Sequence, residues 1–459
     1  MPNKRVLVAV ALLGYLGLSQ AFAQPDSQEP HSSTSDNTQL PSAKALGDVF
    51  FKSRDSFIFS VGIQQSATNN LYFSPVSFVS QGTDDNRYLP FTTLTSRVAF
   101  QRQLPRASVG LDYQAAGILF RDRDSSSFLT QHGGIDLAYR ASPRSTFAVG
   151  DRISVTPAPG RFYQGDSILS PSSAAILPNS TLFVSLNRTI SNAAYASYSY
   201  DLSRRSLISF GAQNTITRFQ QQGLSEMNQS GGHMAYSYRV AEKTTLTLGY
   251  HFAYYDFANP RSADFLRPSG TVVRSHWAYV GITQRLTSSV SAFLQAGPNY
   301  LVGNAIGELG TFSGRPGVRV SVNGGLIFSE AIALDPRTFF SISAGQTISD
   351  GYGLGAVTET QQAGVSLGRR LTKTLTGSVN GSYARNRFLL NTDERGKPIT
   401  TNGVSGGANL SLNLTERVNL FANHTYFRQL STGFYSVIPG RASGNTFTVG
   451  LNYSLAKFF

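Results

Sequence analysis

The chain of 459 residues contains no cysteine. An exported protein without cysteine has no disulfide framework, so its stability must come from other interactions. Histidines are few and scattered, and none forms an H-x-x-x-H pair or another spacing typical of a metal site. Apart from His31 near the N-terminus, they stand at His132, His233, His251, His276 and His424. We therefore expect no metal and no cofactor.

Charge is also scarce, since Asp, Glu, Lys and Arg make up 14% of the chain, against about a quarter in ordinary soluble proteins. No stretch reaches 18 uninterrupted apolar residues, which excludes helical membrane spans. Without Lys4 and Arg5 the chain keeps 37 basic against 26 acidic residues, a formal charge of 37 − 26 = +11. No compact basic block exists, so nucleic acid is not an expected partner. Scattered arginines suit lipopolysaccharide contact and the lining of a wet lumen.

The N-terminus has the pattern of an export signal. Lys4 and Arg5 precede an apolar run over 6–18, and Ala21-Phe22-Ala23 follows as a cleavage site. We predict a signal peptide at 1–23, the alternative being a membrane anchor that would be unusually short. Residues 24–54 are polar and cannot bury enough apolar surface to fold alone, so they are expected to form a flexible periplasmic leader. Residues 55–459 form the third segment.

That third segment alternates between apolar and polar residues. Leu246, Leu248 and Tyr250, for example, share one parity, whereas Thr247 and Gly249 share the other. Period two predicts strands with one apolar and one polar face. About eighteen such segments occur, at approximately 55–68, 93–104, 107–120, 131–141, 145–156, 191–202, 206–219, 230–240, 244–257, 272–285, 288–301, 316–329, 337–349, 360–371, 374–388, 402–414, 417–429 and 445–459.

The connections alternate in length. Short turns share a spelling, as in Leu371-Thr-Lys-Thr-Leu375 and Leu414-Thr-Glu-Arg-Val418, and long loops rich in Gly, Pro, Asp and Asn lie between them. Short turns on one side and long loops on the other are typical of transmembrane barrels. We predict an all-β fold, a transmembrane antiparallel up-and-down β-barrel of about 18 strands, with 16–18 as the range. The short turns and the leader are expected in the periplasm and the long loops outside.

The last strand carries a further pattern. Thr448, Gly450, Tyr453 and Leu455 match a polar-x-Gly-x-x-aromatic-x-hydrophobic motif, and the chain ends on Phe459. This stretch resembles the C-terminal assembly signal of Gram-negative outer-membrane β-barrels, which implies recognition by the barrel-assembly machinery. The whole chain is similar to the broad porin-like group, and it shares its general appearance with barrels associated with exopolysaccharide export. The resemblance implies a place in the bacterial outer membrane.

A barrel of 16–18 strands leaves an aqueous channel. We expect Arg97, Arg152, Arg239, Arg319 and Asn409 to line it, because each lies on the polar parity of its strand. Arg140 and Arg370 share that parity nearer the periplasmic ends. Guanidinium groups around a constriction would favour anions. The alternative is that each arginine is solvated at a mouth or paired with a carboxylate.

The longest connection, 157–190, is the third external loop in this arrangement. The third loop of general porins folds into the barrel, and by that resemblance Arg161, Tyr163 and Asp166 would form a constriction. The alternative is a loop that projects outward.

The function favoured by these observations is passive diffusion of small hydrophilic, in particular anionic, solutes. Two alternatives remain open: a conduit or accessory for exopolysaccharide export, and a surface-exposed binding barrel with an occluded lumen. No local Ser/His/Asn or Asp/His motif indicates an enzyme. Expected partners are outer-membrane lipid, lipopolysaccharide, the assembly machinery and the solutes, and a homo-oligomer is a further option.

Overall fold

A computed structural model describes residues 55–69, 88–120, 128–156, 188–219, 226–257, 271–286, 290–304, 317–328, 338–350, 357–392, 398–432 and 441–458. These ranges contain eighteen strands, numbered along the chain. Within the same ranges no helix is long and apolar enough to cross a membrane. The predicted signal peptide, the leader and the proposed constriction residues Arg161, Tyr163 and Asp166 lie outside the described residues.

The strands are β1 (Ser56–Thr68), β2 (Leu89–Gln103), β3 (Ala107–Phe120), β4 (Phe128–Ser142), β5 (Ser145–Thr156), β6 (Thr189–Asp201), β7 (Ser206–Phe219), β8 (Met227–Ala241), β9 (Thr244–Phe257), β10 (Thr271–Arg285), β11 (Val290–Asn304), β12 (Gly317–Phe328), β13 (Thr338–Asp350), β14 (Val357–Arg370), β15 (Leu375–Thr392), β16 (Pro398–Asn413), β17 (Val418–Ser431) and β18 (Arg441–Phe458).

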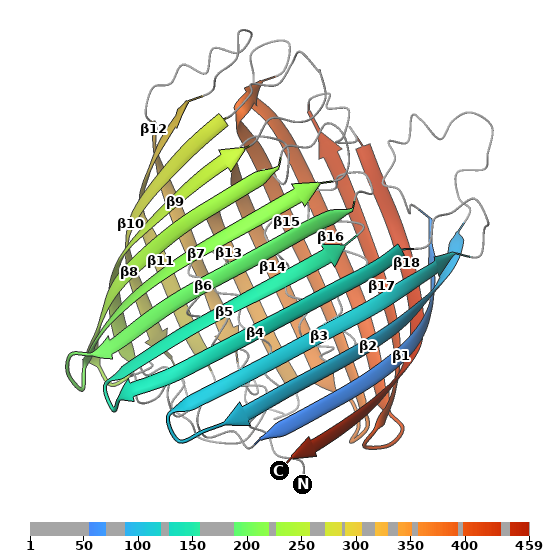
Figure 1. The fold of residues 1–459 in the computed structure, drawn as a ribbon. Helices are drawn as coiled ribbons and strands as arrows, with labels where there is room; N and C mark the ends of the chain where they lie inside the picture. Colours follow the sequence, from blue (N-terminus) through green and yellow to red (C-terminus); the bar gives the residue numbers. More distant parts are fainter. Residues whose placement is uncertain are drawn as a thin grey trace.

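All eighteen strands belong to one antiparallel sheet in which each strand pairs with its neighbours in the chain (Figure 1). The sheet closes on itself because β1 also pairs with β18, from Ser56 opposite Phe458 to Thr68 opposite Thr446. Closure leaves no free edge, so the wall satisfies its own backbone hydrogen bonds. The prediction of an all-β up-and-down barrel of about eighteen strands is confirmed.

The register gives the wall two distinct faces. Residues directly opposite one another point to the same side, so the outward parity can be followed from strand to strand around the sheet. On that parity large apolar side chains are exposed, for instance Leu248 at 61%, Val280 at 60% and Leu129 at 58%. The inward parity carries small and polar side chains, among them the buried Ser60, Ser197 and Asn452. Large apolar side chains therefore cover the outside of the cylinder, whereas its interior is mainly small and polar.

The repeated spelling of the short turns has a structural reason. In the turn between β14 and β15, the hydroxyl of Thr372 accepts a hydrogen bond from the backbone N–H of Leu375 at 3.0 Å. Thr415 makes the same bond with the N–H of Val418 at 3.0 Å between β16 and β17. A hydroxyl in this position stabilises a tight turn by bonding to the backbone a few residues further on.

Four glycines on the inner wall lie beneath a ring from the residue directly opposite. The pairs are Gly150 with Tyr195, Gly211 with His233, Gly249 with Tyr279, and Gly450 with Phe421. In every pair a Cβ atom on the glycine would overlap the ring. The rings can therefore lie flat along the wall only because their partners have no side chain, and we call these four the ring-on-glycine pairs.

Candidate functional site on the inner wall

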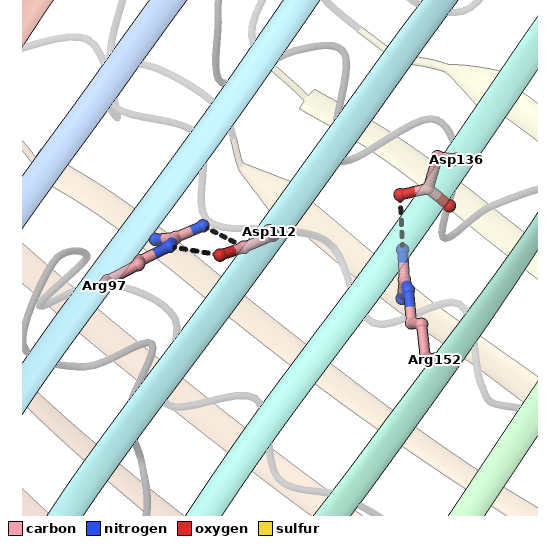
Figure 2. A network of polar contacts seen from close by, with 4 residues as sticks. All are labelled: Arg97, Asp112, Asp136 and Arg152. Carbon is pink, nitrogen blue, oxygen red and sulfur yellow. Dashed lines mark hydrogen bonds and ion pairs between the residues drawn. The ribbon is translucent and has the colours of Figure 1, made fainter.

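A charged group lies on the inner face of β2–β5. Arg97 on β2 donates to Asp112 on β3, with Nε to Oδ1 at 2.9 Å and Nη2 to Oδ2 at 2.5 Å. On the next two strands, Nη2 of Arg152 on β5 lies 3.7 Å from Oδ2 of Asp136 on β4 (Figure 2). The hydroxyl of Tyr195 on β6 donates to the other oxygen of Asp136 at 2.6 Å.

These pairs decide the electrostatics of this part of the wall. Arg97 and Arg152 are inward by register, but each has a carboxylate partner on the neighbouring strand. Two guanidinium groups and two carboxylates leave no net formal charge. The pairs are partly exposed, with side-chain exposures of 22% and 46% in the first and 46% and 21% in the second, so water screens them. We interpret the group as a hydrophilic, neutral section of the wall.

A second set of arginines lies at the short-turn end. All four are inward by register and lie within the last three residues of their strands: Arg140 on β4, Arg239 on β8, Arg285 on β10 and Arg370 on β14. Among the described strand residues, the inward carboxylate at this end is Asp201, at the end of β6. Four arginines and one aspartate give 4 − 1 = +3 among these five residues, which we call the arginine ring.

The turns beyond the ring add positive charge. Seven basic residues stand in the described short connections at this end, against two glutamates, so these turns sum to 7 − 2 = +5: Arg106, Arg144, Arg204, Arg205, Lys243, Lys373 and Arg417, with Glu242 and Glu416. The backbone N–H of Arg140 donates to the carbonyl of Arg106, in the turn before β3, at 2.8 Å. The N–H of Arg239 donates in the same way to the carbonyl of Arg205, in the turn before β7, at 2.7 Å. These bonds hold the ends of β4 and β8 against the neighbouring turns. The short-turn mouth is therefore strongly basic.

The wall formed by β14–β18 and β1 has a different chemistry. Most of its inward side chains are amides and hydroxyls, interrupted by the buried rings of Phe388, Phe421 and Phe427, and Arg370 at the turn end is the charged member among the described residues. The hydroxyl oxygens of Ser382 and Ser405 lie 2.6 Å apart across β15 and β16. The side-chain amide of Asn419 donates to the hydroxyl oxygen of Ser411 at 2.7 Å. Asn409 is inward too, and its Oδ1 is buried with no hydrogen-bond partner in the described structure.

The loop end of the lumen is apolar in part. Tyr255, Phe257, Met227 and Val273 are inward residues of β8–β10 with exposures between 1% and 4%. They belong to one hydrophobic cluster with Ile348 and Val357 at the loop ends of β13 and β14. Water does not reach the wall at this position.

The remaining sequence-predicted residues fall as follows. Arg319 lies on β12, where its backbone pairs with the inward Asn299, and its side chain is not among those described. Gly450, Tyr453 and Leu455 lie on β18 and pair with Gln64, Val61 and Phe59 of β1, whereas Phe459 lies outside the described residues. Tyr453 and Leu455 share the outward parity, and Gly450 faces inward beneath Phe421.

Sequence reasoning missed the carboxylates Asp112 and Asp136 and the arginine Arg285. Asp112 stands between the outward Leu111 and Tyr113, so the alternation alone would have placed it inside. Among the described residues no group of three or more His, Cys, Asp or Glu side chains could hold a metal ion. His233 and His251 are opposite each other, and the ring of His233 lies over Gly211 on β7.

Comparison with known proteins gives a likeness of fold. No family model matches the chain, and no curated protein matches it. Among solved structures the chain is similar to OccAB4 of Acinetobacter baumannii, with 11% identity, a TM-score of 0.44, and coverage of 88% of this chain and 99% of the other. It is similar to OccK2 of Pseudomonas aeruginosa (12% identity, TM-score 0.43, coverage 88% and 99%). It is also similar to a mutant ferric enterobactin receptor of Pseudomonas aeruginosa (11%, TM-score 0.44, coverage 88% and 81%).

Proposed function

We propose that this protein is a channel of the bacterial outer membrane through which small hydrophilic solutes diffuse passively, with anions preferred over cations. The observation that carries this proposal is the closed wall of eighteen strands, with exposed apolar side chains outside and charged or polar side chains inside. A barrel of 16–18 strands encloses a channel wide enough for water.

The outer face supports a membrane location. Exposed Leu, Val, Ile, Phe and Tyr side chains occur on the outward parity of neighbouring strands all round the barrel. Exposing such side chains to water costs about 25 cal/mol of free energy per Å² of apolar surface, and contact with lipid avoids this cost. The strands have 12–18 residues, which is enough for a tilted span of about 9–11 residues with some overhang.

The arginine ring supports the anion preference. Its five residues sum to +3, and the basic turns surround them, so the potential at the short-turn mouth attracts anions and repels cations. The paired charges on β2–β5 cancel and contribute little to this selectivity. We propose that the short-turn end faces the periplasm and the loop end faces outward, which places the ring at the periplasmic mouth.

Planar-bilayer recordings test this function. The wild-type protein is expected to give discrete conductance steps and a reversal potential in a salt gradient that reports anion selectivity. Arg239→Gln with Arg370→Gln should shift that potential toward zero, and Arg319→Glu should shift it in the same direction if its side chain lines the lumen. Arg102→Gln, on the outward parity of β2, is the matched control. Cation-selective wild-type channels would refute the proposal.

A second candidate is a binding barrel whose lumen is occluded. Three buried inward residues at the loop end favour it, Tyr255, Phe257 and Val273, which form one cluster with Ile348 and Val357. A water-filled mouth would hydrate these three inward side chains. Silence in bilayers from correctly folded protein would favour this candidate over the channel.

A further inference from the structure

Four arginines point away from the lumen near the loop end of the barrel: Arg385 and Arg387 on β15, Arg428 on β17 and Arg441 on β18. All four side chains are exposed and lie on the outward parity. Arg385 and Arg441 belong to one row of paired residues that crosses β15–β18, and Arg428 lies one row nearer the turn end. We call these four the arginine patch.

The patch has little negative charge around it. Strands β15–β18 contain no aspartate or glutamate. Glu359 on β14 lies 4.0 Å from Arg387 and partly neutralises it. Within the described part of the chain, no carboxylate contacts Arg385, Arg428 or Arg441. Among the described residues, three guanidinium groups of the patch therefore have no carboxylate partner.

The position of the patch indicates headgroup depth. An arginine on the lipid face destabilises a barrel strongly at the middle of the membrane and hardly at its surface. Tyr383 and Tyr426 are exposed on the same face two residues nearer the turn end, where aromatic side chains of an interfacial girdle are expected. Still nearer the turn end, Phe447 and Val449 are 49% and 56% exposed. Charged, amphipathic and apolar side chains thus follow one another along the wall.

This order matches a ligand with phosphate groups above and acyl chains below. Guanidinium groups bind phosphate through paired, charge-assisted hydrogen bonds. The Asn402 side-chain oxygen accepts from the Tyr383 hydroxyl at 3.2 Å, a bond that does not use the amide N–H groups of Asn402, which are donors suited to sugar hydroxyls. We infer that the arginine patch binds the phosphorylated sugar headgroup of lipopolysaccharide, with its acyl chains along β16–β18. This inference rests on the proposed orientation, in which the loop end meets the outer leaflet.

The opposite side of the barrel differs, because its outward arginine Arg218 on β7 lies 4.0 Å, Nε to Oε2, from Glu226. On the outward face of β5–β8, Asn192 donates to Asp151 at 2.7 Å, and Asn214 donates to Asn228 at 2.9 Å. A carboxylate among amides does not attract phosphate. The patch is therefore a local site and not part of a uniform basic belt.

The test compares lipopolysaccharide binding by two variants of the full chain, purified in detergent. Arg385→Gln/Arg428→Gln/Arg441→Gln removes the three unneutralised arginines. Each arginine at a membrane surface contributes about fivefold to binding of anionic lipid, so the triple variant should bind on the order of 100-fold more weakly. The control, Arg218→Gln/Arg274→Gln, removes outward arginines at the same end of β7 and β10 and should bind within a few fold of wild type.

Three results would overturn the inference: unchanged binding by the triple variant, an equal loss in the control, or binding of phosphatidylglycerol vesicles as tight as binding of lipopolysaccharide. The last result would assign the site to ordinary phospholipid. Unboiled samples on gels show whether each variant is folded. Conductance is recorded in parallel, because a wild-type barrel that binds lipopolysaccharide but never conducts would refute the channel and leave this inference intact.

Discussion

Gly249→Ala should destabilise the barrel although it adds one methyl group. Gly249 faces inward on β9, and a Cβ atom there would overlap the ring of Tyr279, which is 6% exposed. That ring is also stacked on Trp277, with centroids 4.5 Å apart and an interplanar angle of 29°. The new methyl group must therefore displace a buried ring that already has a partner.

The magnitude follows from three contributions. Loss of the Trp277–Tyr279 stack costs about 0.5–1.5 kcal/mol, and strain from overpacking costs about 1–3 kcal/mol. Replacing glycine restricts the unfolded chain, which offsets about 0.5–1 kcal/mol. The free energy of unfolding should therefore fall by about 0.5–4 kcal/mol, with a central value of about 2 kcal/mol.

The assay uses the chain's single tryptophan. Because Trp277 is the only tryptophan and lies against Tyr279, its fluorescence reports both global unfolding in denaturant and displacement of the ring. Gly117→Ala is the matched control, since a Cβ atom at Gly117 meets nothing within 4 Å. In a Tyr279→Ser background Gly249→Ala should become nearly neutral, giving a coupling energy of about 1–3 kcal/mol. An equal loss at Gly117, or no loss at Gly249, would refute the reasoning.

Three further predictions can be tested on folded yield or stability. Gly450→Val should reduce the heat-modifiable fraction on gels, because the side chain would meet the Phe421 ring, and Phe421→Ala should partly restore it. Arg97→Leu and Asp112→Leu should each lower the unfolding midpoint by an amount equivalent to about 0.5–1 kcal/mol, since the pair is partly exposed; the double variant should lose less than the sum. Thr415→Val should cost about 1 kcal/mol through the lost turn hydrogen bond, and Thr415→Ser should retain it.

Periodicity was sufficient for the strands where both faces are well marked. The predicted ranges 107–120, 145–156, 206–219 and 244–257 coincide with β3, β5, β7 and β9. The prediction was least accurate at loop ends, where β15 continues to Thr392 and β18 begins at Arg441. Strands that project beyond the membrane no longer need an apolar face, so the alternation disappears there although the backbone pairing continues.

Parity also predicted which side of the wall a residue faces, but not which residue it meets. Arg97 was expected inside, and the register puts it there; its bond to Asp112 depends on how β2 and β3 are aligned across their turn. The ring-on-glycine pairs escaped prediction for the same reason, because Gly249 and Tyr279 are adjacent only once β9 and β10 are in register. The alternation within one strand does not determine how that strand is aligned with its neighbours.

The junction between β1 and β18 has a consequence for biogenesis. Its two strands come from opposite ends of the chain, for example Ser66 and Thr448, whose hydroxyl oxygens lie 2.9 Å apart. On the proposed outer-membrane location, this junction cannot form until β18 has been synthesised and exported, and until then both strands of the junction expose unpaired backbone groups that hydrocarbon does not tolerate. Insertion before that moment would be unfavourable, so we expect the chain to be held in the periplasm in an unfolded, soluble state until its last strand arrives.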